Sequence, residues 1–117
     1  MVLRSSIDHE LRPLVKALRN RIDGLTPVTT GKKDGREVFE RETVPFMMLE
    51  IRRDHMNLDL WLPQDKLKDA RASGIARSHP FEPNEAVRVR FERAKDLTMV
   101  ARWLEAAHAH AVDRNAN

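Results

Sequence analysis

Residues 44–62, with the sequence VPFMMLEIRRDHMNLDLWL, decide the fold of this chain. Successive side chains of a β-strand point to opposite faces of the sheet. In the first half of the stretch, one face receives Met47, Leu49 and Ile51, and the other receives Phe46, Met48, Glu50 and Arg52. In the second half, after a turn at 53–55, the apolar face receives Met56, Leu58, Leu60 and Leu62. The stretch therefore predicts two antiparallel strands, 44–53 and 56–62, with one buried face and one opposite face.

Shorter β-like runs precede and follow this pair. Residues 28–30 and 36–41 flank a polar insert at 31–35 that contains Asp-Gly, a hairpin signal. A last strand is indicated by Val87, Val89 and Phe91, whose intervening Arg88 and Arg90 point to the opposite face. We expect an antiparallel sheet of about four strands.

Apolar side chains at steps of three and four predict a helix near each end of the chain. The first spans about residues 7–23, with Ser6 as its cap, and Pro13 favours a start near Arg12 because proline is tolerated in the first turn. The second follows Asp96, a candidate cap, and its apolar stripe runs to Ala111. Met99 and Trp103 lie beside that stripe, where they either pack on the first helix or form a dimer seam.

These elements predict an α+β fold, a two-layer sandwich in which the N- and C-terminal helices pack on one face of the sheet. A chain of 117 residues suits one domain, assigned to residues 1–112, with a polar tail at 113–117 that we expect to fray. The connection 63–85 is 23 residues long, whereas most connections have about 4 to 6. Residues 64–72 predict a turn or two of helix, and the remainder predicts an irregular binding loop.

The composition excludes several classes of site. The chain has no cysteine, which removes disulfides, thiolate nucleophiles, iron–sulfur clusters and cysteine-bound zinc. No stretch approaches the ~20 apolar residues that a membrane-spanning helix needs, so we expect no membrane partner and a cytoplasmic location. The net charge of +3 suits an anionic partner. However, 18 acidic residues are interleaved with 21 basic ones, as on an ordinary solvated surface.

Four short segments carry a resemblance to a known family. They are Leu11-Arg12-Pro13-Leu14, then Val44-Pro45-Phe46 with Glu50-Ile51-Arg52-Arg53, and Leu58-Asp59-Leu60; Leu104-Glu105-Ala106-Ala107 adds to them. With these segments the chain resembles a family of small bacterial domains of unknown function, sometimes labelled predicted transport proteins. More distantly, it is similar to iron-chaperone-like domains. The resemblance implies an accessory binding role and brings no catalytic residue with it.

The candidate site is the sheet face opposite the apolar core. Alternation places on it Glu50, Arg52, Asn57, Asp59, Trp61, Arg88 and Arg90. A tryptophan beside arginines offers stacking and cation–π contacts to a base or another planar anion. The alternative is a solvated face whose charges form cross-strand ion pairs. The long connection adds Lys66, Lys68, Arg71, Arg77 and His79, which either close over this face or belong to a solvated turn.

No nucleophile, general base or metal-ligand set can be recognised in the sequence. Helical metal ligands must lie three or four residues apart to share a face, and in the predicted last helix, whose stripe ends at Ala111, only His108 with Glu105 does so. We therefore predict no catalytic residue, metal or cofactor. The favoured hypothesis is a non-catalytic binding or accessory module for an anionic ligand, nucleic acid or partner protein, acting as monomer or homodimer. The alternative is a small enzyme or metal carrier whose histidines and carboxylates meet only in space.

Overall fold

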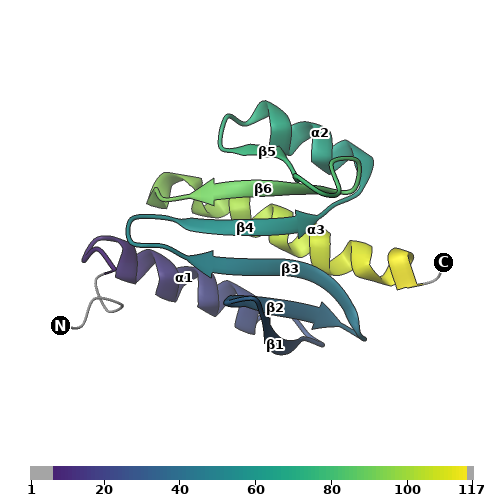
Figure 1. The fold of residues 1–117 in the computed structure, drawn as a ribbon, viewed down its shortest axis with the longest axis horizontal. Coiled ribbons are helices and arrows are strands. Elements are labelled where there is room, and N and C mark those ends of the chain that lie inside the picture. Colours follow the sequence, from purple (N-terminus) through teal and green to yellow (C-terminus); the bar gives the residue numbers. More distant parts are fainter. Residues whose placement is uncertain (1–6, 116–117) are drawn as a thin grey trace.

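A computed structural model describes residues 7–115 and contains an antiparallel sheet with helices behind it (Figure 1). In chain order the elements are α1 (Leu11–Asp23), β1 (Thr29–Lys33), β2 (Arg36–Arg41), β3 (Val44–Ile51), β4 (Met56–Trp61), α2 (Gln64–Ala72), β5 (Ala76–Ser78), β6 (Ala86–Phe91), η1 (Ala94–Asp96) and α3 (Leu97–Asn115). None of the helices within 7–115 is long and apolar enough to cross a membrane.

The sheet has six strands in the order β1-β2-β3-β4-β6-β5. The predicted α+β class and antiparallel sheet are confirmed, but the expected number of about four strands is wrong. The hairpin strand β1 extends the sheet at one edge, where all five of its residues are exposed. At the other edge β5 has only three residues, too few to produce a recognisable alternation of apolar side chains.

The two long helices cover one face of the sheet. Figure 1 shows α1 and α3 behind the strands, and both contribute buried side chains to the same core as β3, β4 and β6. Leu18 of α1, Leu104 of α3 and Leu58 of β4 are each at most 1% exposed. Trp103 also belongs to this core, so it packs within the domain and is not free for a dimer seam.

A bulge in the β2–β3 pairing corrects the predicted placement of Phe46. Phe39 pairs with Met47, but the next residue, Glu40, pairs with Pro45, so Phe46 has no partner across the ladder. The extra residue turns Phe46 to the helical side, where its ring lies edge-on to His108 of α3 with centroids 5.2 Å apart. Phe46 and Met47 are consequently both fully buried, although they are neighbours in a strand.

The connection between β4 and β6 is more ordered than the sequence predicts. It contains the nine-residue helix α2, which buries Leu67 and Ala70, and the strand β5. Only 79–85 remains an irregular loop, which we call the 79–85 loop. The helix predicted at 64–72 is present as α2, and its two buried apolar side chains anchor it against the sheet edge. The expectation that the remainder is irregular is wrong for 76–78, which pair with β6 as strand β5.

The start of α1 and the end of α3 agree only partly with the helix boundaries predicted from the sequence. α1 begins at Leu11, so Pro13 lies in its first turn as the alternative start predicts. The proposed cap Ser6 lies outside the described residues. At the other end, α3 continues to Asn115, and Arg114 donates a hydrogen bond to the carbonyl oxygen of Pro45. Residues 113–115 are thus helical.

Candidate functional site: the face opposite the helices

The open face of the sheet is organised around one buried carboxylate. Asp59 of β4 is 3% exposed. Arg88 of β6, its register partner, donates two hydrogen bonds to it, from Nε at 2.7 Å and from Nη2 at 3.0 Å. Arg36 of β2 lies 3.5 Å from the same carboxylate. This pairing raises the pKa of Arg88 above its ordinary value, so the predicted cross-strand ion pair is present here.

His79 links Asp59 to the 79–85 loop. Its Nδ1 lies 3.1 Å from the backbone nitrogens of both Phe81 and Glu82, and its Nε2 lies 3.1 Å from Asp59. Because two N–H groups point at Nδ1, that nitrogen must be the acceptor and Nε2 must carry the proton. Both ring nitrogens are therefore occupied, and His79 has no free lone pair to act as a general base.

Trp61 is covered rather than offered to a ligand. The ring is 6% exposed, its indole N–H donates to Glu82 at 3.3 Å, and the guanidinium of Arg114 lies 5.5 Å from its centroid. The stacking role that the sequence suggests for Trp61 needs an open ring face, and the loop takes that space. The aromatic side chain that the loop does present is Phe81, which is 85% exposed.

Arg52 and Arg90 are each paired with a carboxylate two residues away in sequence. Arg52 lies 3.2 Å from Glu50, and Arg90 lies 2.8 Å from Glu92. The amide of Asn57 and then Arg52 hold the pKa of Glu50 below its ordinary value. The two arginines differ in position. Arg90 lines a cavity, whereas Arg52 is exposed to solvent and lines none of the described cavities.

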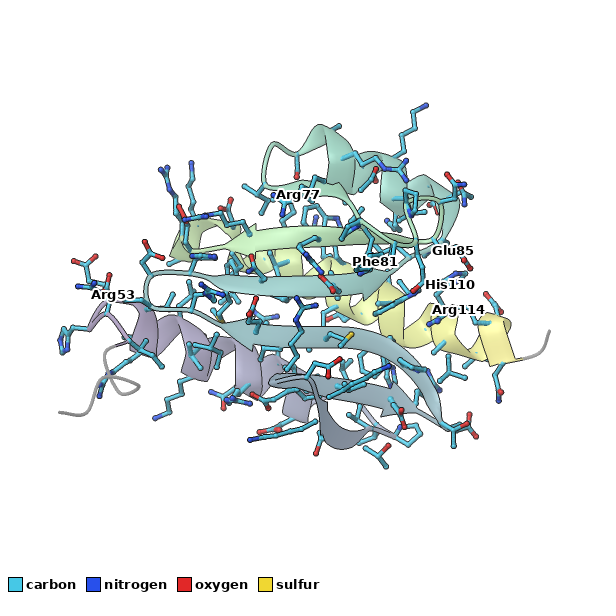
Figure 2. All side chains as sticks on the ribbon, viewed as in Figure 1. Arg53, Arg77, Phe81, Glu85, His110 and Arg114 are labelled. Atoms are coloured by element: carbon cyan, nitrogen blue, oxygen red, sulfur yellow. The ribbon has the colours of Figure 1, made fainter. Side chains whose placement is uncertain are left out.

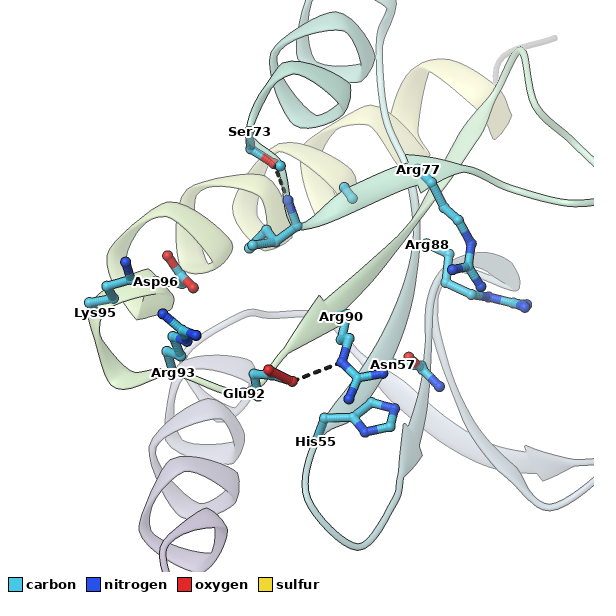
Figure 3. Close-up of a pocket in the computed structure, with 13 residues that line it drawn as sticks. His55, Asn57, Ser73, Arg77, Arg88, Arg90, Glu92, Arg93, Lys95 and Asp96 are labelled. Atoms are coloured by element: carbon cyan, nitrogen blue, oxygen red, sulfur yellow. Dashed lines mark hydrogen bonds and ion pairs between the residues drawn. The ribbon is translucent and has the colours of Figure 1, made fainter.

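A cavity of about 530 Å³ lies where β5, β6, η1 and the β3–β4 turn meet (Figure 3). We call it the arginine pocket. Its lining is His55, Asn57, Ser73, Gly74, Ile75, Ala76, Arg77, Arg88, Arg90, Glu92, Arg93, Lys95 and Asp96. Five of these residues are cationic and two are carboxylates, so the pocket is positive. Within residues 7–115, the exposed side chains of Arg77, Arg93 and Lys95 have no hydrogen-bond or ion-pair partner.

A second cavity of about 820 Å³ lies beside it on the same face, between the β1–β2 hairpin and the 79–85 loop. We call it the aromatic groove. Its lining is Thr30, Gly31, Lys32, Lys33, Asp34, Arg36, Val38, Glu40, Pro45, Met48, Asp59, Trp61, His79, Phe81 and Glu82. Figure 2 shows Phe81 and Arg77 on the viewer's side of the sheet, opposite the helices. The two cavities therefore open to the same side of the molecule.

The predicted site residues are thus divided by the structure. Arg77, Arg88 and Arg90 come together in the arginine pocket, and Trp61 and His79 form part of the groove wall. Lys66 and Arg71 lie on α2 and line neither cavity; Arg71 instead donates to the carbonyl oxygen of Pro83 at 2.6 Å. Alternation along the strands does not indicate Arg93 and Lys95, which line the same pocket. Their signal in the sequence is two cations within four residues of the end of the last strand.

The histidines do not assemble a metal site. Within the part of the chain that the structure describes, no group of three or more histidines and carboxylates is placed to hold a metal ion. His108, which lies three residues after Glu105 in α3, has Nε2 at 3.0 Å from the carbonyl oxygen of Pro27 and Nδ1 at 3.2 Å from Arg41. Both of its ring nitrogens are occupied by structural contacts.

Comparison with known proteins adds no relative: no family model, no curated protein and no solved structure matches the chain. The resemblance to the small bacterial domain family stays a prediction from the short segments that carry it.

Proposed function

We propose that this chain is a non-catalytic binding module whose arginine pocket holds the phosphate groups of an anionic ligand. The observation that carries the proposal is a set of three cations around one cavity, Arg77, Arg93 and Lys95, which have no partner in the described part of the chain. Guanidinium groups match the geometry of phosphate oxygens, and a cluster of cations in a concave site raises the local concentration of anions.

The register of the sheet strengthens this proposal. Arg77 of β5 is the direct partner of Arg88 of β6. Like charges directly opposite each other destabilise a sheet. Asp59 offsets the charge of Arg88, but Arg77 has no such carboxylate among residues 7–115. An anion bound between β5 and η1 would offset it. The pairing of Arg77 with Arg88 is therefore less unfavourable when an anion is bound beside it.

The available side chains favour binding over catalysis. The pocket offers donors from arginine and lysine, whereas its histidine, His55, is paired with Asp54 at 2.8 Å. In the groove, Asp59 and His79 bring a carboxylate and a histidine together, but each is saturated by structural contacts. The alternative of a small enzyme or metal carrier gains no specific support from these contacts. A cytoplasmic location, expected from the sequence, remains part of the proposal.

The test is a titration of the ¹⁵N-labelled protein with inorganic pyrophosphate, followed by amide chemical shifts. We expect the largest shifts at residues 76–77, 88–90 and 93–96. The triple variant R77A/R93A/K95A should lose these shifts, since it removes the unpartnered charges without breaking any described contact. A control variant, K16A/R21A/R102A, removes three exposed cations from the helical layer and should respond as the unmodified chain does. Shifts that are absent, or equal in both variants, would remove the proposal.

A further inference from the structure

We infer that the anionic ligand is single-stranded nucleic acid, with its sugar–phosphate backbone in the arginine pocket and a base against Phe81 in the aromatic groove. This inference rests on the proposed function and names the chemical class of its ligand. It requires that the two cavities form one continuous path, that Phe81 be held in place, and that the charges be distributed as a nucleotide chain needs.

One row of register partners makes the path continuous. The row crosses all six strands and consists of Gly31, Val38, Met48, Asp59, Arg88 and Arg77. Its first four members line the aromatic groove, and its last two line the arginine pocket. The cavities therefore meet at the ion pair between Asp59 and Arg88. A chain lying across the strands passes from one to the other without leaving the sheet surface.

Phe81 is exposed but not loosely held. Its backbone N–H donates to Nδ1 of His79, which is itself fixed by Asp59. The rings of Phe81 and His79 have centroids 6.0 Å apart, and those of His79 and Trp61 are 5.8 Å apart. Three rings thus stand in series, and the outermost is open to solvent. An anchored aromatic ring with a free face is the platform on which single-stranded proteins stack bases.

The charges of the two cavities differ in the way that a nucleotide chain requires. The arginine pocket has five cations against two carboxylates, which favours phosphate. In the aromatic groove, Lys32, Lys33 and Arg36 face four carboxylates, while Val38, Pro45 and Met48 supply apolar surface. A groove without excess positive charge but with apolar walls suits an uncharged, planar base.

The open ring of Phe81 favours a single strand over a duplex. Bases in a duplex are stacked on one another and expose only their edges, so their faces cannot reach an aromatic side chain. An acidic peptide would satisfy the arginine pocket but would have no use for a stacking platform. The dependence of binding on Phe81 therefore separates a single strand from the other anionic ligands.

The experiment is fluorescence anisotropy with a labelled oligothymidylate of about twelve nucleotides, a length within the usual range for one small binding domain. Loss of one stacked base typically weakens binding about tenfold, and we expect this from F81A. The same variant should retain the pyrophosphate response of the arginine pocket. The matched control is V112A, which removes the other large exposed apolar side chain found within residues 7–115, on α3. It should bind as the unmodified chain does.

The outcomes separate the inference from the proposed function. If F81A binds the oligonucleotide as tightly as V112A does, or if a duplex or polyglutamate of similar charge binds as well as the single strand, the inference is overturned while the pyrophosphate result stands. If pyrophosphate itself gives no response, the proposed function fails as well. Because Phe81 is 85% exposed, its removal leaves the core intact, and an unchanged amide spectrum away from the loop verifies this.

Discussion

At the scale of single residues, His79 and Asp59 determine the shape of the open face. Asp59 is buried and bound by three side chains from three different elements. His79, held by Asp59, accepts hydrogen bonds from two backbone N–H groups of the 79–85 loop and so fixes the loop to the sheet. The loop in turn covers Trp61 and presents Phe81. A single carboxylate thus decides which aromatic ring is available to a ligand.

Replacing His79 with alanine should release this loop. The substitution removes the acceptor of two backbone N–H groups and one hydrogen bond to Oδ2 of Asp59. We therefore expect a loss of about 2 kcal/mol in the free energy of unfolding. Chemical denaturation measures the loss, and hydrogen exchange should show weakened protection of the amides of Phe81 and Glu82. The exposed His9 provides the control variant H9A. Equal exchange at these two amides in both variants would contradict the anchoring role.

At the scale of elements, the bulge between β2 and β3 moves one side chain, Phe46, from the open face that alternation predicts to the core, while Met48 stays on the open face as predicted and lines the aromatic groove. We expect F46A to lower the free energy of unfolding by about 4 kcal/mol, as removal of a buried aromatic side chain usually does. M48A should lower the free energy of unfolding by less than about 1 kcal/mol, because Met48 is only partly buried. Thermal or chemical denaturation of the two variants tests this, and similar losses would show that the bulge is misplaced.

The attachment of α1 to the sheet includes a partly exposed ion pair. Arg19 donates two hydrogen bonds to Glu37 of β2, at 2.6 and 3.0 Å, and this contact holds the pKa of Glu37 below its ordinary value of 4.5. A carboxylate with a lowered pKa in the folded state stabilises the fold above its unfolded pKa. The contribution is lost as the pH falls through the folded pKa.

E37Q should therefore be less stable than the unmodified chain at neutral pH by about 0.5 kcal/mol, a small value because the pair is partly exposed to solvent. The difference should vanish in acid, where Glu37 is itself protonated and resembles glutamine. Urea denaturation at several pH values follows both chains. E105Q, at an exposed position of α3, should show no such pH-dependent difference; a constant offset for E37Q across the range would argue against the ion pair.

At the scale of the whole molecule, the helical layer and the open face have separate tasks. The helices lie behind the sheet and bury its apolar side (Figure 1). Both cavities that carry the proposals are lined by residues of the other side. Substitutions within the open face can therefore change binding without removing core contacts.

The salt dependence of oligothymidylate binding is a property of this face as a whole. If the three unpartnered cations of the arginine pocket each neutralise a phosphate, raising the salt from about 50 to about 200 mM should weaken binding about twentyfold. R77A/R93A/K95A should lose most of this dependence, whereas F81A should keep it, because stacking releases no counterions. Anisotropy titrations at both salt concentrations measure the slopes. A slope unchanged in the triple variant would place the phosphates elsewhere.

The local patterns of the chain were sufficient for the class of fold and for the two faces of the central strands. Alternation at Met47, Leu49, Leu58 and Leu60 predicts the core side correctly, because the two-residue period of a strand and the 3.6-residue period of a helix are properties of neighbouring residues. The positions of Arg88 and Arg90 on the opposite face follow from the same period.

The tertiary structure alone decided the site. The pairing of β5 with β6 places Arg77 opposite Arg88, and a loop held by His79 covers Trp61 and exposes Phe81. The bulge that turns Phe46 inward depends likewise on the partner strand. None of these features leaves a local pattern, since each is set by contacts between residues far apart in the chain. For this protein, the sequence by itself determined which sides of the strands are apolar, and long-range packing determined which polar and aromatic groups remain free to bind.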